Sequence, residues 1–304
     1  MAGRYGQRHA SWARRPCWRY PDDVRRTLGL GLASGLGLAA VALPTFVMPL
    51  GAVHADVLVP RVINGSPGSP ISAVAVSIEL PEGYCTAALW KPRVLVTAAH
   101  CINGDGGGAQ GVSASSIQVF TPGGDRRAGP SPVKVSRIVY DPNWKQTQDD
   151  IAFLVLDAPL GTPVIARLAL AAEIRQLAAQ HASATYVGYG QTAPRNDPDA
   201  PISSVPLSLA QPLADSSGSG GTFELVGDGV RGTCAGDSGG PFVATIGPEL
   251  VLLGPLSGGF GRPCESDDDA SSDEAAIAAE HGDLIATALA AVSENAEPMA
   301  CASG

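Results

Sequence analysis

Residues 89–101 read LWKPRVLVTAAHC, and this stretch decides the architecture that the sequence predicts. Apart from residues 91–93, the run up to Ala98 is mostly apolar and rich in branched side chains, a pattern that favours a buried strand. It leads directly to a histidine, His100, which is followed by a cysteine that could anchor it, Cys101. We therefore expect a β-scaffold that presents His100 at the end of a strand.

Further short β-like segments lie on both sides of this stretch, separated by turns rich in glycine and proline. Many short strands with frequent turns favour antiparallel barrels or sandwiches. Two stretches look helical instead, Arg167–Gln180 and Gly282–Ser293, and the second has one apolar face that would cap the end of the domain. The β-like segments are residues 74–80, 117–120, 133–139, 151–156, 184–189, 241–246 and 250–256.

The composition describes a globular and acidic protein. The chain has 304 residues, of which 45% are hydrophobic and 16% charged, so it can bury a substantial core. Residues 62–304 hold 12 Lys and Arg against 26 Asp and Glu, which leaves them with a net charge of −14. Because an acidic surface repels a phosphate backbone, the sequence argues against nucleic acid and anionic membranes as partners.

The N-terminal region reads as a targeting segment. An arginine-rich stretch precedes a weakly hydrophobic run over residues 28–53. The short segment that ends this region, at the small residue Ala55, would form the cleavage site of the leader. An uncleaved membrane anchor is the alternative, which the glycines and prolines of the run disfavour. The pair Arg25 and Arg26 also fits a twin-arginine export signal, which stands as an alternative. We expect residues 1–55 to be a leader and the mature protein to be secreted, without membrane contact.

Export would place the cysteines in an oxidising compartment, where disulfides form. Cys17 leaves with the leader, and five cysteines remain. Cys301, near the end of a polar tail, is left over, while the other four allow three different pairings. These four are Cys85, Cys101, Cys234 and Cys264.

The candidate nucleophile is Ser238, which lies in the segment GDSGGP at residues 236–241. Flanking glycines let the backbone turn sharply and let a substrate carbonyl approach the N–H groups. Because a serine hydroxyl is a poor nucleophile near neutral pH, a base must take its proton. His100 is the candidate base, since His181 and His281 lie in polar, helix-like surroundings where a solvent-exposed histidine is expected.

A base histidine works best when a carboxylate holds its tautomer and stabilises the imidazolium. Asp150 is the candidate because it adjoins the apolar segment 151–156, which can fix it in place. Asp149 competes for the same role, although it belongs to the polar turn before the segment.

Six separate segments, in this order, resemble the trypsin and chymotrypsin family, whose catalytic residues follow the order His, Asp, Ser. The likeness covers residues 62–264. It implies an all-β fold of two packed six-stranded antiparallel β-barrels with a C-terminal helix, in a protease domain over residues 62–304 with a subdomain boundary near 165–182. The matching segments are RVING at 61–65, TAAHC at 97–101, YDPNW at 140–144, DIA at 150–152, VGYG at 187–190 and CAGDSGGP at 234–241.

The resemblance also implies a mechanism. Ser238, His100 and Asp150 would form a triad that hydrolyses peptide bonds through an acyl-enzyme, and the N–H groups of Gly236 and Ser238 would hold the oxyanion. No metal or organic cofactor is required. The implied disulfides join Cys85 to Cys101 and Cys234 to Cys264, each beside a catalytic segment.

The resemblance further implies activation by cleavage after Arg61. An activating protease would remove the pro-segment at residues 56–61 and free the α-amino group of Val62. In this family that group pairs with the carboxylate beside the serine, here Asp237. Because a buried charge without a partner is costly, the pairing would switch on the oxyanion pocket.

The specificity pocket departs from the family pattern. An aspartate occupies the pocket base in trypsin, and its absence here predicts an apolar or mixed preference. The acidic run at residues 265–274 reads as a solvated loop, with a calcium site as an alternative that lacks the usual ligand alternation. Thr86 and Ala87 replace the usual glycines after the first cysteine, and Gly258 replaces a tryptophan. The implied substrate-binding residues are Gly232, Thr233, Ser257, Gly258 and Gly259, and the residues of the acidic run that would restore a preference for Arg or Lys are Asp267, Asp268 or Asp269.

The expected partners are protein or peptide substrates and the activating protease, and we expect a monomer. A catalytically inactive homologue that binds proteins is the alternative function. An esterase of the α/β-hydrolase fold using Ser238 and His281 is disfavoured, because only 66 residues follow Ser238 and the upstream sequence lacks βαβ alternation.

Overall fold

The computed structural model describes most of the chain from Val62 to Glu294. The leader, Arg61, Asp267–Asp269 and Cys301 lie outside the described residues, so the predictions made for them stay predictions. No helix in the described part of the chain has the length and apolar character needed to span a membrane. The described ranges are 62–81, 83–103, 111–145, 147–194, 200–261, 263–264 and 272–294.

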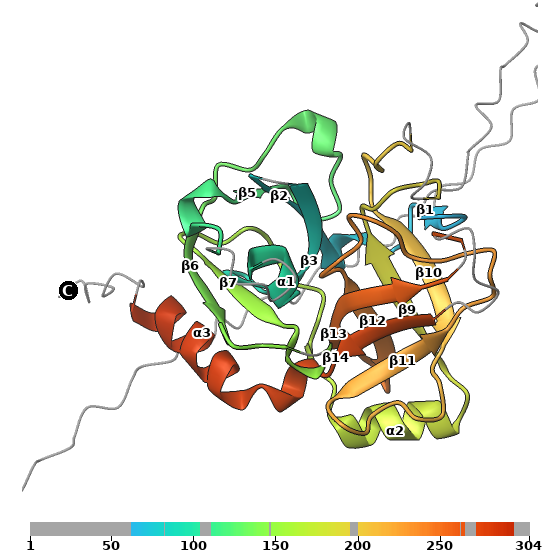
Figure 1. The fold of residues 1–304 in the computed structure, drawn as a ribbon. Helices are drawn as coiled ribbons and strands as arrows, with labels where there is room; N and C mark the ends of the chain where they lie inside the picture. Colours follow the sequence, from blue (N-terminus) through green and yellow to red (C-terminus); the bar gives the residue numbers. More distant parts are fainter. Residues whose placement is uncertain are drawn as a thin grey trace, which may run out of the picture. The chain divides into compact units, whose positions relative to one another are not determined.

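The first half of the described chain forms a six-stranded antiparallel sheet in the order β5–β2–β3–β4–β7–β6 (Figure 1). The predicted strand at residues 89–98 is divided between two of these strands, because Pro92 cannot donate a ladder hydrogen bond and the chain turns at Pro92 and Arg93. The strands are β2 (Ala75–Leu80), β3 (Gly83–Lys91), β4 (Val94–Thr97), β5 (Gln118–Val119), β6 (Val135–Tyr140) and β7 (Ala152–Leu156).

The second half, joined by β1 from the start of the described chain, forms an eight-stranded sheet in the order β1–β10–β9–β12–β13–β14–β11, with β8 pairing in parallel with β13. The predicted all-β fold of two antiparallel sheets with a C-terminal helix is confirmed. The second sheet has more strands than the six predicted, because the two-residue strands β1 and β8 add to it. The strands are β1 (Ser66–Pro67), β8 (Arg167–Leu168), β9 (Ser183–Gly188), β10 (Leu207–Pro212), β11 (Thr222–Val226), β12 (Pro241–Ile246), β13 (Glu249–Phe260) and β14 (Ser272–Ala276).

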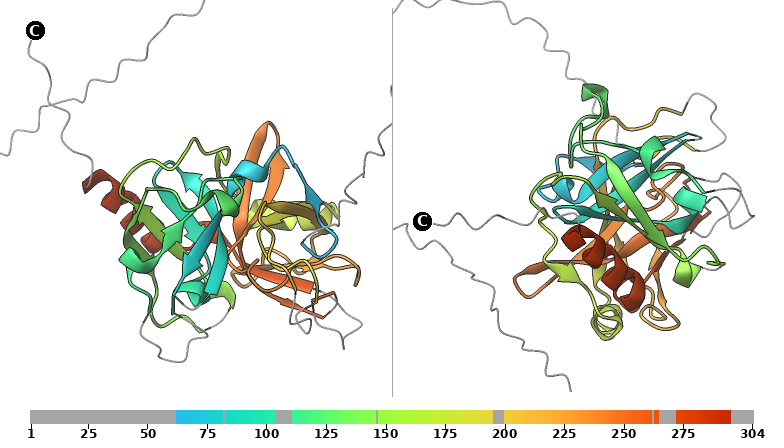
Figure 2. Two further views of the ribbon diagram at one scale, coloured as in Figure 1. Left: turned by 90° about the horizontal axis from the view of Figure 1, so that it is seen from above. Right: turned by 90° about the vertical axis from the view of Figure 1, so that its left-hand side faces the viewer.

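Three α-helices accompany the sheets: α1 (Ala99–Asn103), α2 (Ala171–Ala179) and α3 (Gly282–Glu294). The sequence placed the start of α2 four residues too early. The N–H of Leu170 donates to the side chain of Glu173 at 2.8 Å, which satisfies an N–H that the helix start leaves unpaired. Helix α3 matches its prediction and packs against the first sheet, as both views in Figure 2 show.

A shared hydrophobic core joins the two sheets and α3. Such a core holds the sheets in one arrangement, because close-packed interiors resist sliding. Catalytic groups carried by different sheets can therefore keep a fixed geometry. Its buried members include Val96, Phe153 and Val155 from the first sheet, Val187, Val243 and Leu252 from the second, and Ala288 and Ala291 from α3.

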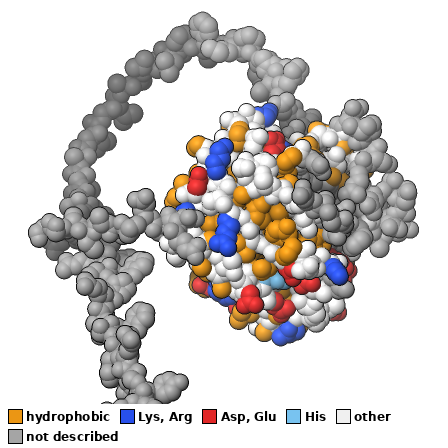
Figure 3. All heavy atoms as spheres, turned by 60° about the vertical axis from the view of Figure 1, so that its left-hand side comes forward, with side chains coloured by type: hydrophobic (Ala, Val, Ile, Leu, Met, Phe, Trp, Pro, Cys, Tyr) orange, Lys and Arg blue, Asp and Glu red, His pale blue; other side chains and the backbone are white. Residues whose placement is uncertain are grey.

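The acidic run predicted as a solvated loop ends as a strand. Asp273 lies in β14 and is only 4% exposed, while its neighbours Ser272 and Glu274 are less buried. Strand geometry explains the difference, since successive side chains point to opposite faces. On the face drawn in Figure 3, acidic, basic and apolar side chains are interspersed.

Candidate active site

The pairing of β4 with β7 brings His100 and Asp150 together. Thr97 lies opposite Ala152 in this pair, so the helix that follows β4 and the loop that precedes β7 meet at one edge. The backbone N–H of His100 donates to Asp150 Oδ1 at 2.8 Å, and the ring atom Nδ1 lies 2.7 Å from Oδ2. The carboxylate therefore fixes both the backbone and the ring of the histidine.

A third donor reaches Asp150 from the second sheet. The hydroxyl of Ser257, in β13, donates to Oδ2 at 2.5 Å. The Asp150 side chain is 2% exposed, and a carboxylate buried this deeply needs such donors to remain charged. Asp149, the competing candidate, ends a short 3-10 turn and forms no hydrogen bond with His100 among the described residues.

His100 lines the same cavity as Ser238. When Nδ1 carries the proton that Asp150 accepts, Nε2 is left as a proton acceptor. A cavity of about 570 Å³ is lined by His100, Ser238 and the Cys85–Cys101 side of the first sheet. Among the described residues no hydrogen bond joins Ser238 Oγ to Nε2, and such bonds often tighten only when substrate binds.

The loop that carries Ser238 adopts a conformation that requires glycine. Gly236 has a φ of 88° and Gly239 a φ of 77°, in the region that side chains rarely adopt. A side chain at Gly236 would also collide with the ring of Tyr84. The N–H groups of Gly236 and Ser238 have no acceptor among the described residues, so both remain available to an oxyanion.

Thr86, where the family has a glycine, braces this loop from β3. Its backbone N–H donates to the carbonyl oxygen of Ser238 at 2.9 Å. Its hydroxyl donates to the carbonyl oxygen of Gly236 at 3.0 Å and accepts from the N–H of Tyr189 at 3.2 Å. The substitution therefore adds contacts to the serine loop, a role that the sequence did not reveal.

Asp237, beside the nucleophile, is completely buried. Its carboxylate accepts from the N–H of Gly190 at 2.8 Å and the N–H of Cys234 at 2.9 Å, and the hydroxyl of Tyr186 lies 3.0 Å from it. Burial raises the pKa of Asp237 to about 7, although these three hydrogen bonds lower it. No lysine or arginine of the described residues forms an ion pair with this carboxylate.

Val62 is also completely buried, and it packs in the core of the second sheet with Tyr186 and Phe242. Its φ is 48°, an unfavourable value for a β-branched residue. Val62 and Asp237, the predicted activation pair, therefore both lie in the region of the second sheet.

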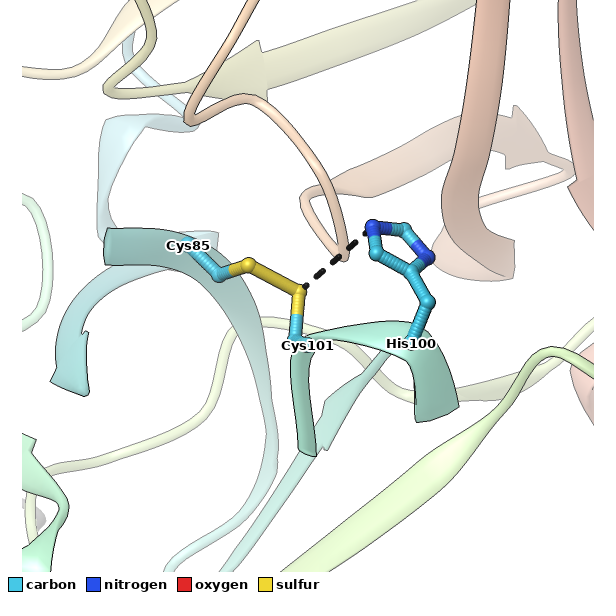
Figure 4. A group of neighbouring side chains, drawn as sticks. All are labelled: Cys85, His100 and Cys101. Carbon is cyan, nitrogen blue, oxygen red and sulfur yellow. Dashed lines mark hydrogen bonds between the residues drawn. A yellow bond between two sulfur atoms is a disulfide. The ribbon is translucent and has the colours of Figure 1, made fainter. Parts of the chain in front are cut away.

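Both predicted disulfides are confirmed: Cys85 bonds to Cys101, and Cys234 bonds to Cys264. The first lies beside His100: Cys101 Sγ is 3.9 Å from His100 Nε2, and a dashed line marks this contact in Figure 4. Although these three side chains cluster as metal ligands do, neither sulfur is a thiolate, which is the form that binds metals.

Two of the predicted pocket residues, Thr233 and Gly259, contact a carboxylate that the sequence did not assign to the site. The hydroxyl of Thr233 donates to Asp273 Oδ1 at 2.5 Å, and Gly259 pairs with Asp273 across β13 and β14. Gly232 is buried and forms an isolated bridge with Ile63. Gly258 and Ser257 precede Gly259 in β13 and are partly buried.

The two other candidate histidines lie apart from Ser238. His181 is exposed, as predicted, 3.7 Å from Asp215. His281 is partly buried and not solvent-exposed as the sequence suggested, and this burial lowers its pKa. It precedes α3 and lines a separate cavity with Asp149 and Glu280.

Residues 62–271 match the model of the family described as Trypsin, which is more than half of the chain. The chain belongs to the trypsin family. It is 29% identical to trypsin beta of Drosophila erecta over 73% of this chain and 88% of the relative. It is 27% identical to trypsin-1 of Astacus astacus over 59% of this chain and 78% of the relative. It is also 27% identical to a trypsin-like protease of Streptomyces glaucescens over 45% of this chain and 48% of the relative. Membership in the trypsin family places the chain among the trypsin-like serine proteases.

Proposed function

We propose that the chain is a secreted serine endopeptidase with Ser238 as nucleophile, His100 as general base and Asp150 as the residue that orients the histidine. One observation carries the proposal: the ring of His100 is held by Asp150 at 2.7 Å, and the same histidine lines one cavity with Ser238. Family membership supplies the reaction class, the hydrolysis of peptide bonds in proteins or peptides.

In the proposed mechanism, Ser238 Oγ attacks the scissile carbonyl while His100 Nε2 takes its proton. The imidazolium then returns a proton to the leaving amine, which leaves an acyl-enzyme that water hydrolyses. Asp150 holds the ring in place through this step, and His100 and Ser257 both donate to its carboxylate. The N–H groups of Gly236 and Ser238 would stabilise the oxyanion, a contribution of about 3–4 kcal/mol for each donor lost.

Cleavage after Arg61 would complete the site. The new α-amino group of Val62 would enter the buried region of Asp237 and supply the cation that this carboxylate lacks. The φ of 48° at Val62 is strained because the valine crowds the preceding carbonyl group. Cleavage would remove that carbonyl and release the strain. The leader at residues 1–55 would direct export, and an activating protease would remove residues 56–61.

Active-site labelling tests this function. Chain processed at Arg61 should react stoichiometrically with a fluorophosphonate probe, and Ser238→Ala should abolish the reaction. Ser116→Ala is the matched control, because Ser116 lines the same cavity and should label normally. Processed protein that does not label and does not cleave a peptide library would contradict the proposal and favour a binding protein with this fold.

A further inference from the structure

Asp273 is a buried carboxylate that the proposed mechanism does not use. It is 4% exposed, and its Oδ1 accepts from the hydroxyl of Thr233 at 2.5 Å. The other oxygen, Oδ2, is buried without a hydrogen-bond partner among the described residues. Burial raises the pKa of Asp273, while Thr233 and the nearby Gln211 lower it. A polar atom left in this state is costly unless a ligand completes it.

No cation of the described residues compensates this carboxylate. Within the described part of the chain, the ion pairs that arginine side chains form involve other acids, namely Glu79, Asp125, Glu173, Glu249 and Asp228. Asp273 also raises the pKa of Asp237, because two carboxylates of like charge repel each other. A buried carboxylate that no cation compensates favours an incoming cation.

Gly259 keeps the approach to Asp273 open. A Cβ atom built on Gly259 would lie 2.6 Å from Asp273 Oδ1 and 3.0 Å from Thr233 Oγ1. Any side chain at this position would therefore cover the carboxylate. Gly259 is itself exposed, and it follows Ser257 in β13, the residue that contacts Asp150. Because Gly259 has no side chain, Asp273 is left uncovered beside the strand that also carries Ser257.

We infer that Asp273 determines the specificity of the pocket and that the pocket takes a cationic side chain, arginine or lysine, from the residue on the N-terminal side of the cleaved bond. This inference rests on the proposed peptidase function. It replaces the expected apolar or mixed preference, which was drawn from the absence of an aspartate at the pocket base. The substrate cation would pair with the free Oδ2 of Asp273, while Thr233 holds Oδ1.

Benzamidine, a small aromatic amidinium, tests the pocket without catalysis. The protein is processed at Arg61, carries Ser238→Ala, and is titrated by calorimetry. We expect binding to weaken at least tenfold in Asp273→Asn and also in Gly259→Val. Glu274→Gln is the matched control, because the adjacent acid of β14 contacts Thr147 instead, and it should bind as the parent does.

A peptide library tests the same inference with Ser238 intact. We expect cleavage after arginine and lysine, with kcat/KM for these substrates at least a hundredfold lower in Asp273→Asn. Cleavage after apolar residues together with no benzamidine binding would overturn the role of Asp273 and leave the peptidase function standing. Benzamidine binding that depends on Asp273 in a protein that cleaves nothing would instead overturn the peptidase function alone.

A separate observation concerns Tyr186, a completely buried residue of β9. Its hydroxyl oxygen lies 2.6 Å from the carbonyl oxygen and 3.0 Å from Oδ1 of Asp237. The ring packs on Phe242 with centroids 5.1 Å apart, and a side chain at Gly188 or Gly240 would collide with the hydroxyl. The hydroxyl therefore has a single fixed position, directed at the residue between the two oxyanion donors.

We propose that Tyr186 is a positioning residue that holds Asp237, and through it the N–H groups of Gly236 and Ser238. The backbone of Asp237 connects these two donors, so a shift of Asp237 moves both. Loss of the hydroxyl would leave the carbonyl oxygen of Asp237 without this donor in a region without solvent, which weakens the hold on the loop. Like the first inference, this one rests on the proposed peptidase function.

Tyr186→Phe in the processed protein should lower kcat about tenfold, while KM and benzamidine binding stay the same, because only the transition state uses the oxyanion donors. Tyr189→Phe is the matched control: its buried hydroxyl donates to Gly124 and not to Asp237. An equal fall of kcat in both variants, or a wild-type kcat in Tyr186→Phe, would overturn the positioning role. An inactive parent protein would count against the peptidase function instead.

Discussion

His100 and Asp150 are joined twice, once through the backbone N–H of the histidine at 2.8 Å and once through its ring at 2.7 Å. Both bonds end on one carboxylate, so Asp150 sets where the histidine lies as well as which ring nitrogen carries the proton. The register of β4 and β7 makes this contact unavoidable, since it brings the two strand ends to the same edge.

Asp150→Asn should therefore lower kcat by about 10⁴-fold, because an amide can favour the wrong tautomer of His100. Asp149→Asn is the matched control and should keep kcat within about threefold of the parent, since Asp149 forms no hydrogen bond with His100 among the described residues. The measurement is steady-state peptide hydrolysis by processed protein. A large loss in Asp149→Asn with little loss in Asp150→Asn would reverse the assignment.

Blocked processing should lower activity by orders of magnitude. Arg61→Gln leaves the α-amino group of Val62 in a peptide bond, so Asp237 gains no cation and the oxyanion pocket is less stable. Val62→Gly should have a similar effect after processing, because the buried valine side chain anchors the new terminus. Hydrolysis rates before and after limited proteolysis, with N-terminal sequencing, provide the check. Full activity in unprocessed protein would refute the switch.

In the unprocessed chain, the free energy of unfolding should depend on pH because the buried carboxylate of Asp237 titrates. Its pKa is raised from 3.8 to about 7, so the folded chain keeps a proton there that the unfolded chain releases. The folded state gains from this group below pH 4 and loses that gain as pH rises to 7. The free energy of unfolding should therefore fall by about 1.4 kcal/mol per pH unit in this window.

Chemical denaturation of Arg61→Gln at a series of pH values measures this slope. The comparison is with the same chain carrying Asp237→Asn, which cannot ionise and removes the contributions that the two proteins share. Asp273, Tyr84 and Tyr186 are the titratable groups coupled to Asp237, and they remain in both. After processing, the ammonium of Val62 should remove most of the slope; an equal slope in processed protein would contradict the activation pair.

Much of the fold and site could be predicted because local signals agree with the final structure. The strand before His100, the glycines around Ser238 and the aspartate before β7 each carry a pattern that nearby residues explain. The cysteine pairs followed from the family resemblance, since spacing alone allowed three pairings. These elements depend on short stretches of chain, which a sequence displays directly.

Asp273 and Tyr186 were missed because their roles depend on contacts between distant strands. Asp273 lies near the end of a run of acids and serines that looks solvated, and only its spacing of two residues from Ala275 in β14 places the two side chains on the same face. Tyr186 lies 51 residues before Asp237, and nothing local signals their contact. Thr86 likewise looked like a simple departure from the family pattern until its partners were visible.

Thr86 provides a test of how firmly the first sheet holds the serine loop. Thr86→Val keeps the shape of the side chain but removes the hydroxyl, so the carbonyl oxygen of Gly236 and the N–H of Tyr189 lose a buried partner. We expect the free energy of unfolding to fall by about 1–3 kcal/mol and kcat to fall with it, because the loop carries the oxyanion donors.

Ser77→Ala is the matched control for Thr86→Val. Ser77 lies directly opposite Thr86 in β2, and its hydroxyl is buried without a hydrogen-bond partner among the described residues. Its removal should leave kcat unchanged and stability unchanged or higher, because no bond is lost and a desolvated polar group disappears. Thermal unfolding and peptide hydrolysis measured on both variants separate the two effects. If Thr86→Val behaved like Ser77→Ala, the hydroxyl of Thr86 would have no part in holding the loop.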